Sequence, residues 1–173
     1  AGTYYLTVKD TSGNVSSSYS ITFCKTTLNA GSGSVSPSYV ITKSGNSFTL
    51  PTPTRSGYTL NNWNTSSSGS GTAYTGSYTV SDSKTLYAIW QDSSKPTGSI
   101  SCTNNVATSQ TVTLTLEDST GVAGYYWGTS STYSSNTYST VGSAPKTTSV
   151  SKTVSSAGTY YLTVKDTSGN VSS

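Results

Sequence analysis

The stretch AGTYYLTVKDTSGNVSS occurs twice in the chain, at residues 1–17 and again, without a mismatch, at residues 157–173. An identity of this length does not arise by chance, and the second copy begins 156 residues after the first. The duplication predicts that the chain is a window on a tandem array with a period of 156 residues. A repeat of that length exceeds one turn of a solenoid and must contain whole domains. Units of this kind usually serve spacing, assembly or adhesion.

The first copy has the pattern of one β-strand followed by a turn. Tyr4, Leu6 and Val8 alternate with threonine and tyrosine, as in a half-buried strand. The segment DTSGN at residues 10–14 then supplies side-chain caps and a glycine for the turn. Because a single strand cannot fold alone, we expect Tyr4, Leu6 and Val8 to be interaction residues that contact a neighbouring copy of the repeat.

The second copy is predicted to close a domain that spans residues 98–173. Its Tyr160, Leu162 and Val164 repeat the alternation and are predicted core residues. Residues 1–17 are then interpreted as the last strand of a preceding copy of that domain. We expect this strand to complete the sheet of another copy, since exposed sheet edges accept added strands.

The composition favours a folded, mainly β chain with polar, uncharged faces. Hydrophobic residues make up 31% of the 173 residues and charged residues only 9%. Disordered chains of such low hydrophobicity are usually rich in charge and poor in aromatic residues, whereas here aromatic residues reach 11%. Large aromatic side chains can supply core area that scarce leucine and isoleucine do not.

The charge pattern argues against two classes of partner. The net charge of +3 comes from nine scattered basic residues, without the runs of Lys and Arg that bind nucleic acid or anionic membrane. No apolar stretch approaches the roughly 20 residues of a membrane span, so we expect no membrane insertion in this segment. Chains rich in Ser, Thr and Tyr and poor in Lys and Glu are common among bacterial surface stalks. We therefore expect an extracellular location on the bacterial cell surface.

The two cysteines are predicted to lie on different faces of their strands. In the alternation of Tyr19, Ile21 and Phe23, Cys24 falls on the opposite, outer face, whereas Cys102 is expected to point inward. Such a pair does not meet at the Cα separation that a disulfide requires, which favours free thiols over an intrachain bridge. An intermolecular bridge through Cys24 is a further alternative.

Residues 18–91 contain a series of spaced motifs. These are PTPTRSGYTLNNW at 51–63, GTAY at 71–74 and LYAIW at 86–90. The series resembles the Listeria–Bacteroides repeat, also called the internalin B-repeat, and departs from it at Leu60 and Asn62. The resemblance implies a small β-grasp-like module of secreted or surface-attached bacterial proteins, without catalytic residues. It also implies that Trp63 and Trp90 are core residues.

Residues 92–97 read as a short linker, and the strands that follow are regular. Val112, Leu114 and Leu116 alternate with outward threonines, and turn residues separate several such strands. This pattern predicts an antiparallel sandwich. The segments EDSTGV at 117–122 and GTYYLTVKDTSGN at 158–170 resemble bacterial Ig-like domains. The predicted fold is therefore mainly β, with a β-grasp-like module, an Ig-like β-sandwich and an N-terminal orphan strand.

The residues needed for catalysis are scarce. The chain has no histidine, which removes the commonest general base and the serine and cysteine triads. Of its six acidic residues only Glu117 and Asp118 are adjacent, and neighbours on a strand end point apart. We therefore predict that the chain is not an enzyme and has no catalytic residues.

Calcium is the one cofactor that the sequence brings into question. Asp92, Asp118, Asp166 and Asn170 are weak candidate ligands that could gather at one end of the sandwich, where hard oxygen ligands would stiffen the chain. Asp-x-x-Gly-Asn is also an ordinary hairpin turn, and we favour that interpretation.

Tyr125, Tyr126 and Trp127 form an aromatic strand whose outward face is a candidate contact surface. Two hypotheses of function follow. The first is a structural repeat of an extracellular stalk or filament, whose partners are neighbouring copies joined through β-strands. The alternative is an adhesin module that binds a glycan or a host surface protein through this strand or the loop at 129–143.

Overall fold

Alternating aromatic or β-branched residues and small polar residues give a chain built from strands. The computed structural model describes residues 1–103, 107–132 and 137–172, and these residues form β-strands and no helix. The prediction of a mainly β chain is therefore confirmed. The strands divide into two units, residues 1–91 and residues 92–173, and each unit has its own hydrophobic core.

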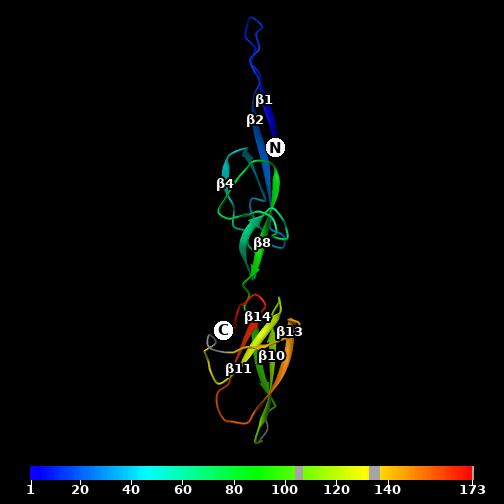
Figure 1. Cartoon of the computed structure of the whole chain (residues 1–173), viewed down its shortest axis with the longest axis vertical. Helices are drawn as coiled ribbons and strands as arrows, with labels where there is room; N and C mark the ends of the chain where they lie inside the picture. Colours follow the sequence, from blue (N-terminus) through cyan, green and yellow to red (C-terminus); the bar gives the residue numbers. More distant parts are fainter. Residues whose placement is uncertain (104–106, 133–136, 173) are drawn as a thin grey trace. The chain divides into compact units, whose positions relative to one another are not determined.

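The first unit is built on a six-stranded mixed sheet (Figure 1). The strand order is β1-β2-β8-β5-β6, with β3 also paired to β2 and with β4 and β7 forming a separate pair. β2 and β8 run parallel, so the strand that enters the body of the unit lies beside the strand that leaves it. The strands are β1 (Gly2–Leu6), β2 (Tyr19–Asn29), β3 (Tyr39–Lys43), β4 (Ser47–Thr49), β5 (Tyr58–Asn64), β6 (Ala73–Tyr74), β7 (Ser77–Thr79) and β8 (Lys84–Asp92).

Aromatic residues supply much of the core of the first unit, as the composition suggested. Trp63 is 1% exposed, and its indole Nε1 donates a hydrogen bond to the Pro51 carbonyl at 3.1 Å. Trp90 is half-buried, and its Nε1 donates to the Ala30 carbonyl at 3.0 Å. Both indole N–H groups thus have partners, which lets these large rings be buried. Gly33 packs so closely on Trp90 that a side chain at this position would collide with the ring.

The prediction for Cys24 is wrong, because β2 carries apolar residues on both faces. Cys24 is 4% exposed and belongs to the core together with Leu28. Tyr19 and Ile21 lie on the opposite face and are exposed. Only the second half of β2 crosses the body of the unit, so the apolar alternation of the first half does not mark the core side.

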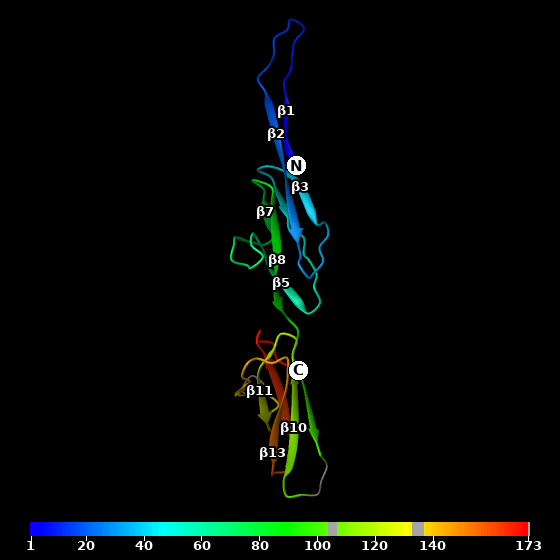
Figure 2. The same ribbon diagram turned by 90° about the vertical axis from the view of Figure 1, so that its right-hand side faces the viewer.

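The first half of β2 forms a long hairpin with β1, which Figure 2 shows as a ribbon projecting from the body of the unit. The pairing is antiparallel and runs from Gly2 opposite Phe23 to Leu6 opposite Tyr19. Within this chain, Gly2–Leu6 therefore pair with the strand that follows them. The turn brings consecutive segments together, so this pairing closes only a short loop. β1 ends the strand order, and its other edge is unpaired among the described residues.

The second unit contains two three-stranded antiparallel sheets, with orders β13-β10-β9 and β12-β11-β14. Its core residues come from both sheets, so the two pack face to face as a sandwich. They are Leu114, Leu116, Val122, Tyr125 and Val164. The strands are β9 (Thr97–Cys102), β10 (Gln110–Glu117), β11 (Val122–Gly128), β12 (Ser139–Thr140), β13 (Thr147–Val154) and β14 (Tyr161–Asp166).

β9 is an edge strand, and this corrects the prediction for Cys102. Ile100 lies opposite the buried Leu114 and Cys102 lies opposite Val112, so both face the core side as expected. At the edge, however, that side is open, and Cys102 is exposed. Both cysteines are free thiols. The segment between β8 and β9 is shorter than the predicted linker at 92–97, because β8 extends to Asp92 and β9 begins at Thr97.

Candidate functional site

The two copies of the 17-residue stretch form the same turn. In the first copy the Asp10 carboxylate accepts a hydrogen bond from the Asn14 side-chain amide at 2.7 Å, and the Asp10 N–H donates to the Asn14 carbonyl at 2.9 Å. Asp166 and Asn170 repeat these contacts at 2.7 Å and 3.0 Å. Gly13 in the first turn has a φ of 94° and its counterpart in the second a φ of 95°, which only glycine adopts readily. The turn is therefore encoded locally.

The environments of the two copies differ. Val8 is 55% exposed, whereas the corresponding Val164 is 0% exposed. Leu6 is 60% exposed, whereas Leu162 is half-buried and packs against the core of the sandwich. The alternation predicted a strand in both places, but only the second copy packs against a buried core.

Residues of both sheets cover the second copy. Leu162 lies opposite Trp127, and Val164 lies opposite Tyr125 on β11. In the facing sheet, a Cβ atom on Gly98 would lie 2.8 Å from the side chains of both Leu162 and Val164. The absence of a side chain at Gly98 thus lets β9 approach the closing strand.

The start of the second unit, the Glu117–Val122 turn and the end of β14 bring three carboxylates together. Oxygen atoms of Asp92, Asp118 and Asp166 all lie within 4.8 Å of one another, and the three residues are buried at 7%, 8% and 1% exposure. The sequence named these three residues and Asn170, and the structure brings all four together: the Asn170 amide Nδ2 donates to the Asp92 carbonyl at 3.3 Å.

Hydrogen-bond donors surround the aspartate cluster formed by Asp92, Asp118 and Asp166. The Asp118 Oδ1 accepts bonds from the N–H groups of Thr120 and Gly121 at 2.7 Å and 2.9 Å. The Thr120 hydroxyl lies 2.7 Å from this same oxygen and 2.8 Å from Asp92 Oδ2. The Thr120 hydroxyl therefore lies between two carboxylates, and its single proton is donated to only one of them at a time.

The carboxylate of Asp92 also has donors of its own, and these set its pKa. Burial raises the pKa of Asp92, but hydrogen bonds from the Ser94 N–H and from the Thr120 and Ser168 hydroxyls lower it more. The pKa therefore lies below its ordinary value, and Asp92 is ionised at neutral pH. The sequence reading missed Thr120 and Ser168. Each lies two residues after an aspartate, which is the spacing of a side-chain-capped turn.

The donor set of the aspartate cluster is all oxygen, which suits a hard cation such as Ca²⁺. Asp92, Asp118 and Asp166 would supply the carboxylates, and Asn170 lies beside them. The same groups cap turns: both oxygens of Asp166 accept bonds from Asn170, and Asp118 holds the turn before β11. These bonds supply a structural use for all three carboxylates.

The aromatic strand does not form a flat exposed platform. Tyr125 is 6% exposed and belongs to the core, so its place among the candidate interaction residues is corrected. Trp127 is half-buried and stacks on Tyr160, with ring centroids 5.3 Å apart. The Tyr126 hydroxyl accepts a hydrogen bond from the Ser130 N–H at 3.0 Å. Part of the predicted binding loop at 129–143, residues 133–136, lies outside the described residues.

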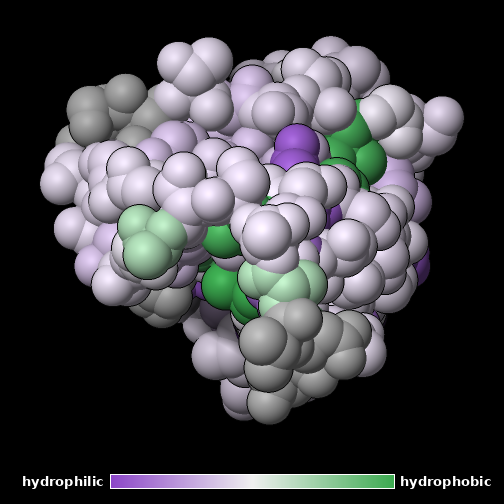
Figure 3. All heavy atoms as spheres, turned by 90° about the horizontal axis from the view of Figure 1, so that it is seen from below, coloured by the Kyte–Doolittle hydropathy of each residue, from purple (hydrophilic) through white to green (hydrophobic). Residues whose placement is uncertain are grey.

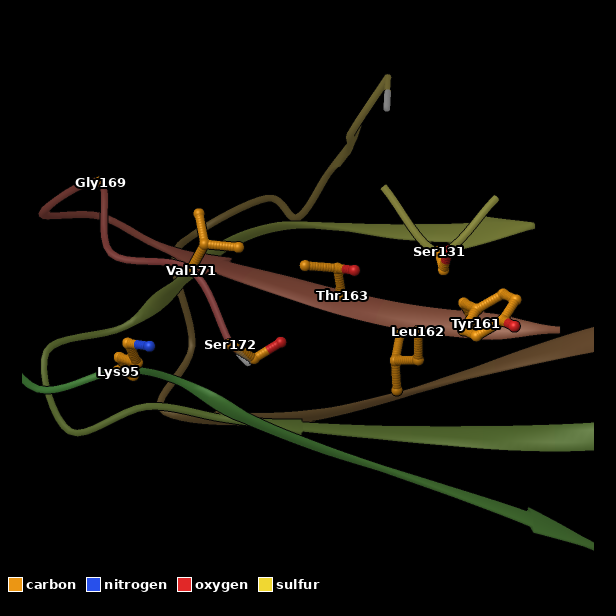
Figure 4. A pocket seen from close by; sticks show the side chains of 8 residues that line it. All are labelled: Lys95, Ser131, Tyr161, Leu162, Thr163, Gly169, Val171 and Ser172. Atoms are coloured by element: carbon orange, nitrogen blue, oxygen red, sulfur yellow. The ribbon is translucent and has the colours of Figure 1, made fainter. Parts of the chain in front are cut away.

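A hollow of about 550 Å³ lies beside β14 (Figure 4). Its walls include Tyr161 and Thr163 of the strand, Val171 beyond the turn, and Lys95 on the opposite side. β14 is the last strand of its sheet; the arm after the turn pairs with its edge at Lys165, whereas the edge beside Tyr161 has no partner strand among the described residues and is open to a further chain. Elsewhere, Figure 3 shows a face that is mostly pale, the colour of weakly polar residues, with hydrophobic residues in a few places.

Asn64 organises the polar loop at 64–72, a role that the sequence reading missed. This side chain is 1% exposed; its Oδ1 accepts from the Ser66 and Gly71 N–H groups, and its Nδ2 donates to the Gly69 carbonyl. The loop consists mostly of serine, threonine and glycine, which have little apolar surface to bury. A buried asparagine that replaces missing backbone partners is the feature that gives this loop its shape.

Glu117 and Asp118 are the two acidic residues that are adjacent in the sequence, and their carboxylates do not share one site. Glu117 is exposed and Asp118 is buried, so the two side chains point apart. No helix among the described residues is long and apolar enough to cross a membrane.

Comparison with known proteins identifies one part of the chain. Residues 19–89 match the family model of the Listeria-Bacteroides repeat domain. These residues are therefore a bacterial surface repeat domain, of a family typical of non-catalytic surface proteins. No family match supports the Ig-like resemblance of residues 98–173. Among curated proteins and among solved structures, none matches the chain.

Proposed function

We propose that the chain is a structural repeat unit of an extracellular bacterial stalk or filament, a spacer and adhesin scaffold whose copies join through β-strand pairing. The repeat domain at residues 19–89 supports a surface location. One observation carries the assembly step: the same 17 residues form an exposed hairpin at residues 1–17 and close a buried sandwich at residues 157–173. An element that closes a domain in one copy and is uncovered in the other suits a joint between copies.

The proposed mechanism is mechanical. β2 begins in the hairpin and continues without a break into the sheet of the first unit. A sandwich closed by residues 1–10 would thus be joined to the next unit through paired strands instead of a flexible linker. Paired strands resist bending more than a Gly/Ser linker does. The weakly charged surface, with 9% charged residues, limits repulsion between closely spaced copies.

Protease treatment of intact source cells tests the location and role. We expect a non-permeant protease to release fragments of this chain while a cytosolic protein stays intact. Electron microscopy of cells labelled with an antibody against residues 18–91 should place the label at a distance from the envelope. Label confined to the cytosol or to the envelope itself would contradict the stalk.

The alternative function is a module that binds a glycan or a host surface protein. The stacked pair of Trp127 and Tyr160, half-buried on the second unit, is the observation that favours it, since an aromatic ring face can stack on a sugar. A glycan array probed with the chain separates the two functions. A spacer gives no specific signal, whereas a signal that is lost in Trp127→Ala, with a Tyr19→Ala control, would assign binding to this pair.

A further inference from the structure

We propose that residues 1–17 close the β-sandwich of a second copy of this repeat, in the place that residues 157–173 take in their own unit. The proposal rests on the strand-pairing assembly proposed above, and it names the partner segment as residues 92–156 of the second copy. It also fixes the register, because the chain itself contains the sequence of the joint in its closed form.

The apolar face of the hairpin lacks cover in its own unit. Tyr4, Leu6 and Val8 lie on one face of β1 and its continuation, and each is more than half exposed, with Tyr4 at 61%. Across the hairpin, Tyr19 lies opposite Leu6 on the same face and is also exposed. A contiguous exposed face of large apolar residues marks an interaction site.

The way in which a sandwich covers this sequence is seen at residues 157–173 of the same chain. There Val164 lies opposite Tyr125 on β11, and its side chain fills the space that the absent side chain of Gly98 leaves open. In the proposed joint the same register places Val8 of one repeat opposite Tyr125 of the other repeat. Because the two closing sequences are identical, each side chain that residues 157–173 place against this sandwich has the same counterpart in residues 1–17.

The aspartate cluster is completed by the same exchange. In its own unit Asp166 lies opposite Val122 at the end of β14 and joins Asp92 and Asp118. In the proposed joint Asp10 of one repeat takes the position of Asp166, beside Asp92 and Asp118 of the other repeat. The turn that presents Asp10 already has the required shape, with the same Asp–Asn contact at 2.7 Å in both copies.

The hairpin does not have to open in order to dock. Lys165 pairs with Gly124 of β11 on one edge and with Val171, in the returning arm, on the other. In the first copy the corresponding Lys9 pairs with Val15, and β2 continues this same arm. β11 of the other repeat would therefore pair with the edge of β1 that has no partner strand. The hollow beside β14 offers space for the start of β2 in this arrangement (Figure 4).

In the intact chain the tethered residues 157–173 fill the site at high effective concentration, so the test must disable them. The full chain with Leu162→Asp and Val164→Asp keeps the free hairpin and the sequence of residues 92–156, but it cannot bury its own closing strand. The matched variant carries the same two changes in the first copy, Leu6→Asp and Val8→Asp. A third variant carries all four changes. Size-exclusion chromatography with light scattering gives the mass of each at several concentrations.

We expect the Leu162→Asp/Val164→Asp chain to form concentration-dependent dimers and longer head-to-tail oligomers, while the matched variant and the four-fold variant stay monomeric. Monomers of the first variant at every concentration would overturn the proposal. Oligomers that persist in the four-fold variant would overturn it too, since they would show aggregation that does not need the hairpin.

A synthetic peptide of residues 1–17 supplies a second measurement that does not depend on oligomer formation. Added in excess to the Leu162→Asp/Val164→Asp chain, it should return the mass to that of one chain plus one peptide and restore the cooperative unfolding of the second unit. A peptide with Leu6→Asp and Val8→Asp should do neither. Equal effects of the two peptides, or no effect of the first, would overturn the proposal and leave the surface location, tested on cells, untouched.

Discussion

Residues 1–17 and residues 157–173 have one sequence and one turn, but only the second copy packs against a core. In both, an aspartate carboxylate and an asparagine amide meet at 2.7 Å and a glycine takes a positive φ. In the second copy, β11 pairs with the strand and a facing sheet covers it. The comparison separates what a short sequence encodes by itself from what its neighbours add. The hairpin is local, and the burial is contextual.

The largest effect that tests this comparison is a charge placed at the same position of each copy. Val164 is fully buried, so Val164→Asp leaves an unpaired carboxylate in the core and should destabilise the second unit by more than about 4 kcal/mol. Val8→Asp changes an exposed position and should alter the free energy of unfolding by about 0.5 kcal/mol or less. Urea unfolding followed by circular dichroism measures both. Equal losses would show that the first copy is buried in solution.

The local half of this comparison could be predicted from the sequence. The period-2 alternation of Tyr4, Leu6 and Val8, with the turn residues after it, indicated a strand and a turn, and both copies have the turn. The gathering of Asp92, Asp118 and Asp166 was also within reach, because each follows or begins a turn at the same end of the predicted sandwich. Their separation along the chain is large, but antiparallel strands return to the same end.

The contextual half could not be predicted, because alternation tells which residues share a face but not whether that face is covered. The alternation of Tyr19 and Ile21 predicts that Cys24 points outward, but β2 carries apolar residues on both faces and Cys24 lies in the core. The sequence predicts the correct face for Cys102, but β9 is an edge strand, which only the sheet order reveals. Likewise, the alternation does not tell which edge of the first strand pairs with β2 and which edge stays unpaired.

A smaller effect is expected where the facing sheet meets the closing strand. Gly98→Ala places a methyl group 2.8 Å from the tips of Leu162 and Val164, and overpacking of this kind destabilises by about 1–3 kcal/mol. Because these tips can shift, we expect the lower end of that range. Ser99→Ala, a neighbouring exposed position on β9, serves as the control and should have little effect. If both variants unfold alike, the close approach of β9 to the closing strand is not what covers the second copy.

Acid should loosen the exposed hairpin. Hydrogen bonds from the Asn14 side chain and backbone hold the pKa of Asp10 below its ordinary value of 3.8. A carboxylate with a lowered folded pKa adds stability that is present above the ordinary value and is lost as the pH falls through the lowered one. The Asn14 amide signals in NMR should therefore lose dispersion below about pH 4. Asp10→Asn, which carries no charge, should show no such transition; a transition that persists in it would have another source.

Calcium gives the smallest expected effect and the sharpest contrast between the copies, because only the second copy places its aspartate beside two others. The hydrogen bonds to Asp92, Asp118 and Asp166 are those of capped turns, so we expect millimolar calcium to leave the melting temperature of the second unit unchanged. A ligand that binds only the folded state raises stability in proportion to the logarithm of its concentration. A rise of that form, lost in Asp118→Asn, would show that the closing strand completes a cation site as well as a core, and calcium would then control the joint.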